Sequence, residues 1–165
     1  MYGEMLKCAV AAVVLAQSAT ADEIAFGIGW DDMFDAGGRE SLSFLFEYHA
    51  DPFFEGHVLN LALMAVIQAD DRGDIFAGVG VHNRTDIGRA RRFFLEASLA
   101  VGHFDEGGNT GTRDNGTRFR TSLGAGVHLS ERERLSLTLD HILDMDFKND
   151  HPGSETLHLR YSRAF

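Results

Sequence analysis

The sequence is short of cysteine, proline and positive charge, and each shortage excludes a class of protein. Its 165 residues include one cysteine, Cys8, which excludes a disulfide scaffold and a zinc site built from several cysteines. The chain has only 2 prolines and is 44% hydrophobic, a composition that argues against a disordered protein. Asp and Glu number 25 against 15 Lys and Arg, and the resulting charge of −10 is unsuited to binding nucleic acid. The length suits one domain, and we expect no cofactor and no metal.

The first 21 residues have the features of a secretory signal peptide. Lys7 precedes an uncharged apolar stretch over residues 8–15, and Ala19-Thr20-Ala21 supplies the small residues of an A-x-A cleavage site. A membrane anchor is the alternative interpretation. It is weaker, because a spanning helix needs about 20 apolar residues and this stretch is much shorter. We therefore expect residues 1–21 to be a signal peptide and residues 22–165 to form one exported, cysteine-free domain.

Beyond this segment, hydrophobic residues recur at every second position. Near the end of the chain, Leu157, Leu159 and Tyr161 share one parity, while His158 and Arg160 share the other. Such alternation predicts β-strands that have one apolar face and one small or polar face. No segment after residue 21 shows a sustained helical period. Eight strands are predicted, at residues 23–30, 40–49, 57–69, 74–85, 91–104, 117–129, 133–143 and 154–165.

An even number of strands, joined by short turns at one end and longer loops at the other, is typical of a bacterial outer-membrane barrel. Eight strands of about 10 residues, together with the turns and loops between them, account for residues 22–165. We therefore predict an all-β fold, an eight-stranded antiparallel transmembrane β-barrel, whose narrow interior is filled by side chains. The inward parity carries small residues and charges of both signs: Gly27, Gly29, Gly78, Gly80, Gly124, Gly126, Glu47, Glu96, Arg118, Arg120, Asp140 and Arg160.

A soluble barrel of the lipocalin type has the same alternation, with its apolar face lining a cavity. Two features favour the membrane. The small, glycine-rich face suits a narrow interior better than a solvated exterior. The last residue is Phe165, with apolar residues at alternate positions before it, and this pattern resembles the C-terminal insertion signal of outer-membrane proteins. We expect a barrel in the bacterial outer membrane, with the tops of the seventh and eighth strands in the leaflet that holds lipopolysaccharide.

His141 and Glu155 fall on the apolar, lipid-facing parity of the last two strands, near the strand tops. A hairpin that pairs residues 139 and 157 also pairs His141 with Glu155, and it sets Glu133 opposite Arg163. Directly opposed side chains on one face have Cβ atoms about 5 Å apart, so the carboxylate can reach the imidazole. Ionisable groups that face lipid cost free energy and indicate a functional site. The other interpretation is that both side chains extend to the lipid headgroups from the strand tops.

The same hairpin resembles the C-terminal hairpin of the lipid A 3-O-deacylases, the PagL family. The resemblance rests on residues 141–144, His-Ile-Leu-Asp, and on residues 151–165, which contain Pro-Gly-Ser-Glu-Thr-Leu and the ending Tyr-Ser-Arg-Ala-Phe. It implies hydrolysis of the acyl ester at the 3-position of lipid A. It also implies that His141 is the general base and that Glu155 orients it. The family's nucleophile is the serine two residues after the histidine, and it faces the lipid as well.

The sequence departs from the family pattern at that nucleophile. Leu143 occupies the serine position and has no nucleophilic group. Asp144 and His151 stand where the motif has asparagines, whose amides are suited to holding an oxyanion. His141 and Glu155 remain at the family's spacing, so the resemblance implies an ester hydrolase whose activity is in question.

Three outcomes are open for the chemistry of this site. The pair could activate water directly, at a much lower rate. The barrel could be a non-catalytic binder of lipid A. A different register could bring Ser162 or another hydroxyl to the site, whereas Ser154, the nearest serine in sequence, has inward parity. The expected partners are lipid A of lipopolysaccharide and the outer membrane, with a homodimer as one option and no nucleic acid. The broader alternatives are a structural or interaction barrel and a soluble periplasmic ligand-binding barrel.

The signal peptide gives the first testable prediction. Protein isolated from the outer membrane of expressing cells should begin at Asp22, because cleavage is expected after Ala21. N-terminal sequencing and intact mass measure this directly. Retention of residues 8–15 in the membrane-bound protein would support the anchor instead.

Overall fold

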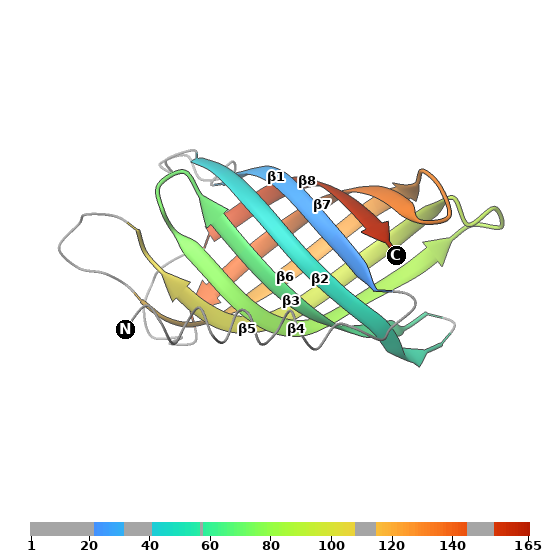
Figure 1. The fold of residues 1–165 in the computed structure, drawn as a ribbon, viewed down its shortest axis with the longest axis horizontal. Coiled ribbons are helices and arrows are strands. Elements are labelled where there is room, and N and C mark those ends of the chain that lie inside the picture. The colour runs from blue at the N-terminus through green and yellow to red at the C-terminus, as the bar shows by residue number, and fades with distance from the viewer. Residues whose placement is uncertain (1–21, 32–40, 57, 108–114, 145–153) are drawn as a thin grey trace.

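Eight antiparallel strands close into a barrel in the computed structural model, which describes residues 22–31, 41–56, 58–107, 115–144 and 154–165 (Figure 1). Each strand pairs with the next one in sequence, and β8 pairs with β1 to close the sheet. Within the described residues, no helix has the length and hydrophobicity needed to cross a membrane. The strands are β1 (Glu23–Asp31), β2 (Ser41–Glu55), β3 (Asn60–Asp70), β4 (Ile75–Ile87), β5 (Phe93–Asp105), β6 (Gly116–His128), β7 (Glu133–Asp144) and β8 (Ser154–Ala164).

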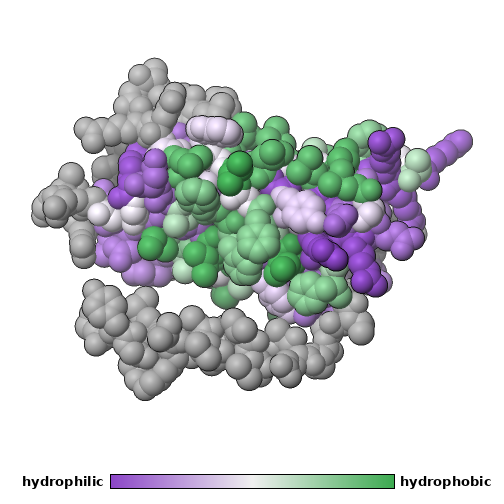
Figure 2. Space-filling view, turned by 45° about the horizontal axis from the view of Figure 1, so that its top comes forward, coloured by the Kyte–Doolittle hydropathy of each residue, from purple (hydrophilic) through white to green (hydrophobic). Residues whose placement is uncertain are grey.

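The apolar face of each strand points outward. In β7, Leu137 is 52% exposed while its neighbour Thr138 is 0% exposed, and in β8 the same contrast separates Leu159 from His158. Figure 2 shows the result on one face of the barrel, where hydrophobic side chains cover the middle and more polar side chains lie toward the two ends. A lipocalin-type barrel would have the opposite arrangement. The predicted transmembrane barrel is therefore confirmed, because this outer surface suits acyl chains.

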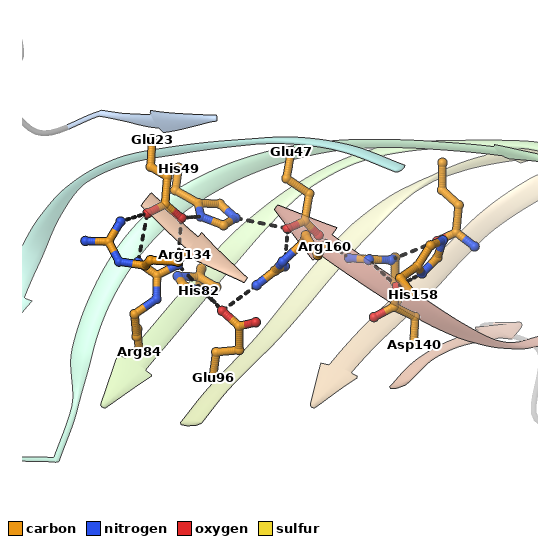
Figure 3. Close-up of polar contacts among 12 residues, drawn as sticks. Glu23, Glu47, His49, His82, Arg84, Glu96, Arg134, Asp140, His158 and Arg160 are labelled. Carbon is orange, nitrogen blue, oxygen red and sulfur yellow. Dashed lines mark hydrogen bonds and ion pairs between the residues drawn. The ribbon is translucent and has the colours of Figure 1, made fainter. Parts of the chain in front are cut away.

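The interior holds a network of buried ion pairs, beside a cluster of buried hydrophobic side chains that includes Leu45, Val66 and Phe76. The carboxylate of Glu47, fully buried, accepts a hydrogen bond from Arg120 at 2.9 Å and another from Arg160. Arg120 also donates to Asp140 at 2.6 Å, and Arg160 pairs with Glu96. Figure 3 shows Arg160 between Glu47 and Glu96, with these side chains coming from different strands. Glu47, Arg120, Asp140, Arg160 and Glu96 therefore each have a partner of opposite sign, as burial requires.

The network continues toward the end that holds the two termini of the barrel. His49 connects Glu47 to Glu23, with its ring nitrogens 3.1 Å from the Glu47 carboxylate and 3.2 Å from the Glu23 carboxylate. Glu23 in turn accepts hydrogen bonds from Arg84, at 2.6 and 3.0 Å, and from Arg134. These contacts form one continuous set of ion pairs and hydrogen bonds inside the barrel that links β1, β2, β4 and β7 (Figure 3).

Inward-facing glycines make room for the larger side chains and for close strand approach, as their parity predicts. A Cβ on Gly126 would lie 2.3 Å from Cζ of Phe94, a fully buried side chain. A Cβ on Gly80 would lie 2.0 Å from the carbonyl oxygen of Leu99 on the paired strand. Only glycine fits at these two positions without moving a neighbour.

The second strand is longer than its sequence predicts. The alternation indicates an end near residue 49, but β2 runs to Glu55 with register shifts on either side of Pro52. Pairing with β1 stops at His49, so the later residues of β2 have a partner only in β3. Proline lacks an N–H and is tolerated where one side of a strand is unpaired, which is why Pro52 does not end the strand.

The carboxyl end of the chain lies at the same end of the barrel as the β4–β5 and β6–β7 turns (Figure 1). The backbone N–H of Phe165 donates to Asp22 at 3.0 Å, and that of Ala164 donates to Arg132 at 2.8 Å. In the predicted orientation this is the periplasmic end. The tops of β7 and β8, at the opposite end, then lie in the outer leaflet.

The interior network predicts a large effect of one isosteric substitution. Glu47→Gln removes the charge that faces Arg120 and Arg160, and breaking a buried ion pair costs about 3–5 kcal/mol of unfolding free energy. Urea unfolding of the barrel in lipid vesicles measures the loss. Glu55→Gln, on an exposed end of the same strand, is the matched control and should change stability little. Equal stabilities of the two variants would contradict the role of the network.

Candidate functional site

His141 and Glu155 lie side by side on the outer wall of the barrel, near the upper ends of β7 and β8. Their Cα atoms are register partners, and Glu133 is the partner of Arg163 in the same hairpin, so the predicted register is confirmed. Nδ1 of His141 is 3.4 Å from Oε1 of Glu155, with the two side chains 28% and 43% exposed. The pair is therefore accessible from outside the barrel.

The neighbours of both residues in sequence fix this outward direction. Asp140 and Ile142 flank His141 and are buried in the interior, Asp140 through its ion pair with Arg120. On β8, Thr156 next to Glu155 is buried and donates to Asp31 at 2.9 Å. Because side chains alternate along a strand, His141 and Glu155 are held on the opposite face.

The other positions of the family motif are placed differently. Leu143 lies on the same face as His141, two residues further along β7, and is 38% exposed. Asp144 is the last residue of β7, where its backbone is the register partner of Arg118. His151 lies outside the described residues, so the structure tests neither its position nor its part in the site.

Neither serine considered from the sequence reaches the pair. Ser154 points inward, as its parity predicts, and its hydroxyl donates to Asp31 at 2.5 Å. Ser162 is 4% exposed and faces the interior, and its register partners are Ala25 and Arg134 near the turn end of the barrel. The alternative in which Ser162 enters the site through another register is therefore wrong.

One hydroxyl beside the pair escaped the sequence analysis. Thr121 of β6 is the register partner of His141, on the side away from Glu155. Its own sequence neighbours, Arg120 and Ser122, are buried in the interior, so Thr121 faces outward. Its Oγ1 donates a long hydrogen bond, 3.5 Å, to the carbonyl oxygen of His141. A threonine at an apolar parity of the sixth strand was the available signal in the sequence.

The arrangement of imidazole and carboxylate suits general base catalysis. A carboxylate beside Nδ1 fixes the imidazole tautomer, leaves Nε2 free to accept a proton, and stabilises the imidazolium that forms. The surroundings are apolar side chains of the outer wall, where an ionised pair is held more strongly than in water. A hydroxyl or a water molecule beside Nε2 would be the group to activate.

The remaining histidines of interest take part in polar packing. His82 faces inward, 3.4 Å from Glu96, and its ring stacks on that of His49 with centroids 4.0 Å apart. His128 lies 2.9 Å from Asp86. Across the part of the chain that the structure describes, no group of three or more His, Cys, Asp or Glu residues is arranged to hold a metal ion.

Comparison with solved structures identifies the class of protein. The crystal structure of the outer membrane enzyme PagL matches with a TM-score of 0.63 at 16% identity, covering 87% of this chain and 99% of that one. A de novo designed transmembrane β-barrel gives 0.60 at 9% identity, with 90% and 98% covered. The attachment invasion locus protein Ail of Yersinia pestis gives 0.57 at 13%, with 90% and 100% covered. The fold is that of an eight-stranded outer-membrane barrel.

The family follows from the sequence. The lipid A 3-O-deacylase (PagL) family model matches residues 24–164, which is nearly the whole barrel, and the chain belongs to this family. No curated protein matches it in sequence. The family and the barrel fold together place the protein in the bacterial outer membrane.

Proposed function

We propose that this barrel hydrolyses the acyl ester at the 3-position of lipid A in the outer leaflet, with His141 as the general base and Glu155 as the carboxylate that orients it. The observation that carries the proposal is the pair itself, which faces the lipid side of the wall with Nδ1 and Oε1 3.4 Å apart. Membership of the lipid A 3-O-deacylase family gives the substrate class.

The position of the pair fits an ester within the leaflet. The ester bonds of lipid A lie at the boundary between headgroup and acyl chains, so a barrel can attack them only from its outer wall. His141 is three residues below the last residue of β7, and Glu155 is the second residue of β8. Leu139 and Leu137 continue the same face of β7 toward the middle of the membrane, where acyl chains would lie.

Hydrolysis requires two proton movements at the imidazole. His141 would first accept the proton of the attacking hydroxyl or water, and it would then donate that proton to the leaving 3-hydroxyl oxygen of the sugar. Glu155 would stabilise the imidazolium between these two steps. Both residues are in register on neighbouring strands, so the reaction needs no loop movement to assemble them.

Leu143 favours a second candidate, a non-catalytic barrel that binds lipid A or supports membrane integrity. The family resemblance puts the nucleophile at this position, and a leucine side chain cannot attack an ester. On this account the outer wall still accommodates lipid A, while the His141–Glu155 pair has no nucleophile to activate.

Mass spectrometry of lipid A from expressing cells separates the two candidates. The wild-type chain should remove one hydroxyacyl group, and His141→Ala should lower the rate at least about 1,000-fold, because the general base is lost. Glu155→Gln should lower it about 100-fold or more, because the imidazole loses its charged partner. His103→Ala, an exposed outward histidine on β5, is the matched control and should leave the rate unchanged.

The result for a leucine-to-serine variant completes this test. If the wild-type chain leaves lipid A intact and Leu143→Ser removes the acyl chain, the non-catalytic candidate is correct. Full activity of His141→Ala would contradict the proposed base.

A further inference from the structure

Three polar side chains form a row across the outer wall of three neighbouring strands. Thr121 of β6, His141 of β7 and Glu155 of β8 are successive register partners. The row places a hydroxyl, an imidazole and a carboxylate in the order that hydrolases use to activate a nucleophile. Nothing in the family motif assigns a role to the threonine, because the motif places its nucleophile two residues after the histidine on β7.

The geometry of an antiparallel sheet lets the threonine hydroxyl reach the imidazole. Directly opposed residues have Cβ atoms about 4.5–5.5 Å apart, and the two side chains lie on the same face. Nδ1 of His141 faces Glu155, so Nε2 is the ring nitrogen without that partner. The hydrogen bond of Thr121 to the carbonyl oxygen of His141 is long, at 3.5 Å, and rotation about χ1 releases the hydroxyl from it.

We propose that Thr121 is the nucleophile of this barrel. It takes the role of the family's serine, whose position is occupied by Leu143 in this chain. The inference deepens the proposed function and rests on it for the identity of the substrate. The nucleophile thereby moves from the next outward residue of β7 to the strand on the other side of His141. The base and its carboxylate keep their places.

The reaction proceeds in two balanced steps. His141 accepts the Thr121 hydroxyl proton as Oγ1 attacks the acyl carbonyl carbon, and the bond from that carbon to the sugar oxygen breaks. The sugar oxygen leaves with the proton from His141, and the acyl group remains as an ester of Thr121. Water then attacks this ester, gives one proton to His141, and releases the fatty acid while Thr121 regains its hydrogen.

Other described hydroxyls near the top of the wall are less suited. Ser154 and Thr156 flank Glu155 but are turned inward and hydrogen-bonded to Asp31. Thr117 lies on the outward face of β6, four residues from Thr121, and its register partner on β5 is His103. Among these residues, only Thr121 is paired in register with the histidine that also contacts a carboxylate.

Two measurements test the proposal. In the first, lipid A deacylation is compared for Thr121→Val, Thr121→Ser and Thr117→Val. Valine has the shape of threonine without the hydroxyl, so Thr121→Val should lower the rate at least about 1,000-fold while the barrel still folds. Thr121→Ser should retain activity because it keeps a hydroxyl, and Thr117→Val, the same change on the same face, should match wild type.

In the second measurement, the purified barrel in micelles is treated with a long-chain β-lactone, which acylates nucleophilic hydroxyls. Peptide mass spectrometry should find the adduct on Thr121, and His141→Ala should abolish it. A purely structural threonine would give no adduct. An adduct on another residue, or on none, would overturn the proposal.

The two measurements keep this proposal separate from the proposed function. If Thr121→Val deacylates lipid A at the wild-type rate, His141 activates water directly. Thr121 is then not the nucleophile, while the proposed hydrolysis of lipid A is supported. If the lactone acylates Thr121 but lipid A stays intact, the nucleophile stands and the proposed substrate is wrong.

Discussion

Buried ion pairs in the lumen decide the direction in which the side chains of this barrel point. Glu47 sits between Arg120 and Arg160, and Arg120 extends the network to Asp140 on β7. Turning any of these strands over by one residue would place these charges in acyl chains and the leucines in the lumen, at a cost of several kcal/mol for each charge. Where strands are paired on both sides, a closed sheet also leaves no backbone group unpaired toward the lipid. The register and the outward face are therefore fixed together.

The candidate site depends directly on that interior. Asp140 is locked inside by Arg120 and by His158, whose ring nitrogen is 2.7 Å away, and this holds His141 on the outside. On β8, Thr156 does the same for Glu155 through its hydrogen bond to Asp31. The polar pair on the outer wall is thus positioned from behind by residues that never contact a substrate. Folding of the barrel therefore holds His141 and Glu155 on the lipid-facing wall, a position that costs free energy for ionisable groups.

Much of this arrangement could be predicted from the alternation of residues and the short turns. The β7–β8 register, with His141 opposite Glu155, needed only the length of one hairpin. The extension of β2 past Pro52 could not be predicted from the alternation, because it depends on where the pairing of β2 with β1 ends. The partners within the lumen depend on the stagger of strands far apart in sequence. The position of Thr121 beside His141 could also have been predicted from its parity, because a short turn fixes the β6–β7 register.

The central claim is that His141 faces the acyl chains, and spin labels on single cysteines test it most directly. The only cysteine, Cys8, lies in the expected signal peptide, so His141→Cys, Leu137→Cys and Arg89→Cys each give one label in the barrel. In lipid bilayers, collisions with oxygen report an acyl environment and collisions with a water-soluble nickel complex report water. The account predicts that the label at 141 behaves like the one at 137 on the hydrophobic outer wall. Behaviour like that of the label at 89, in an exposed turn, would contradict it.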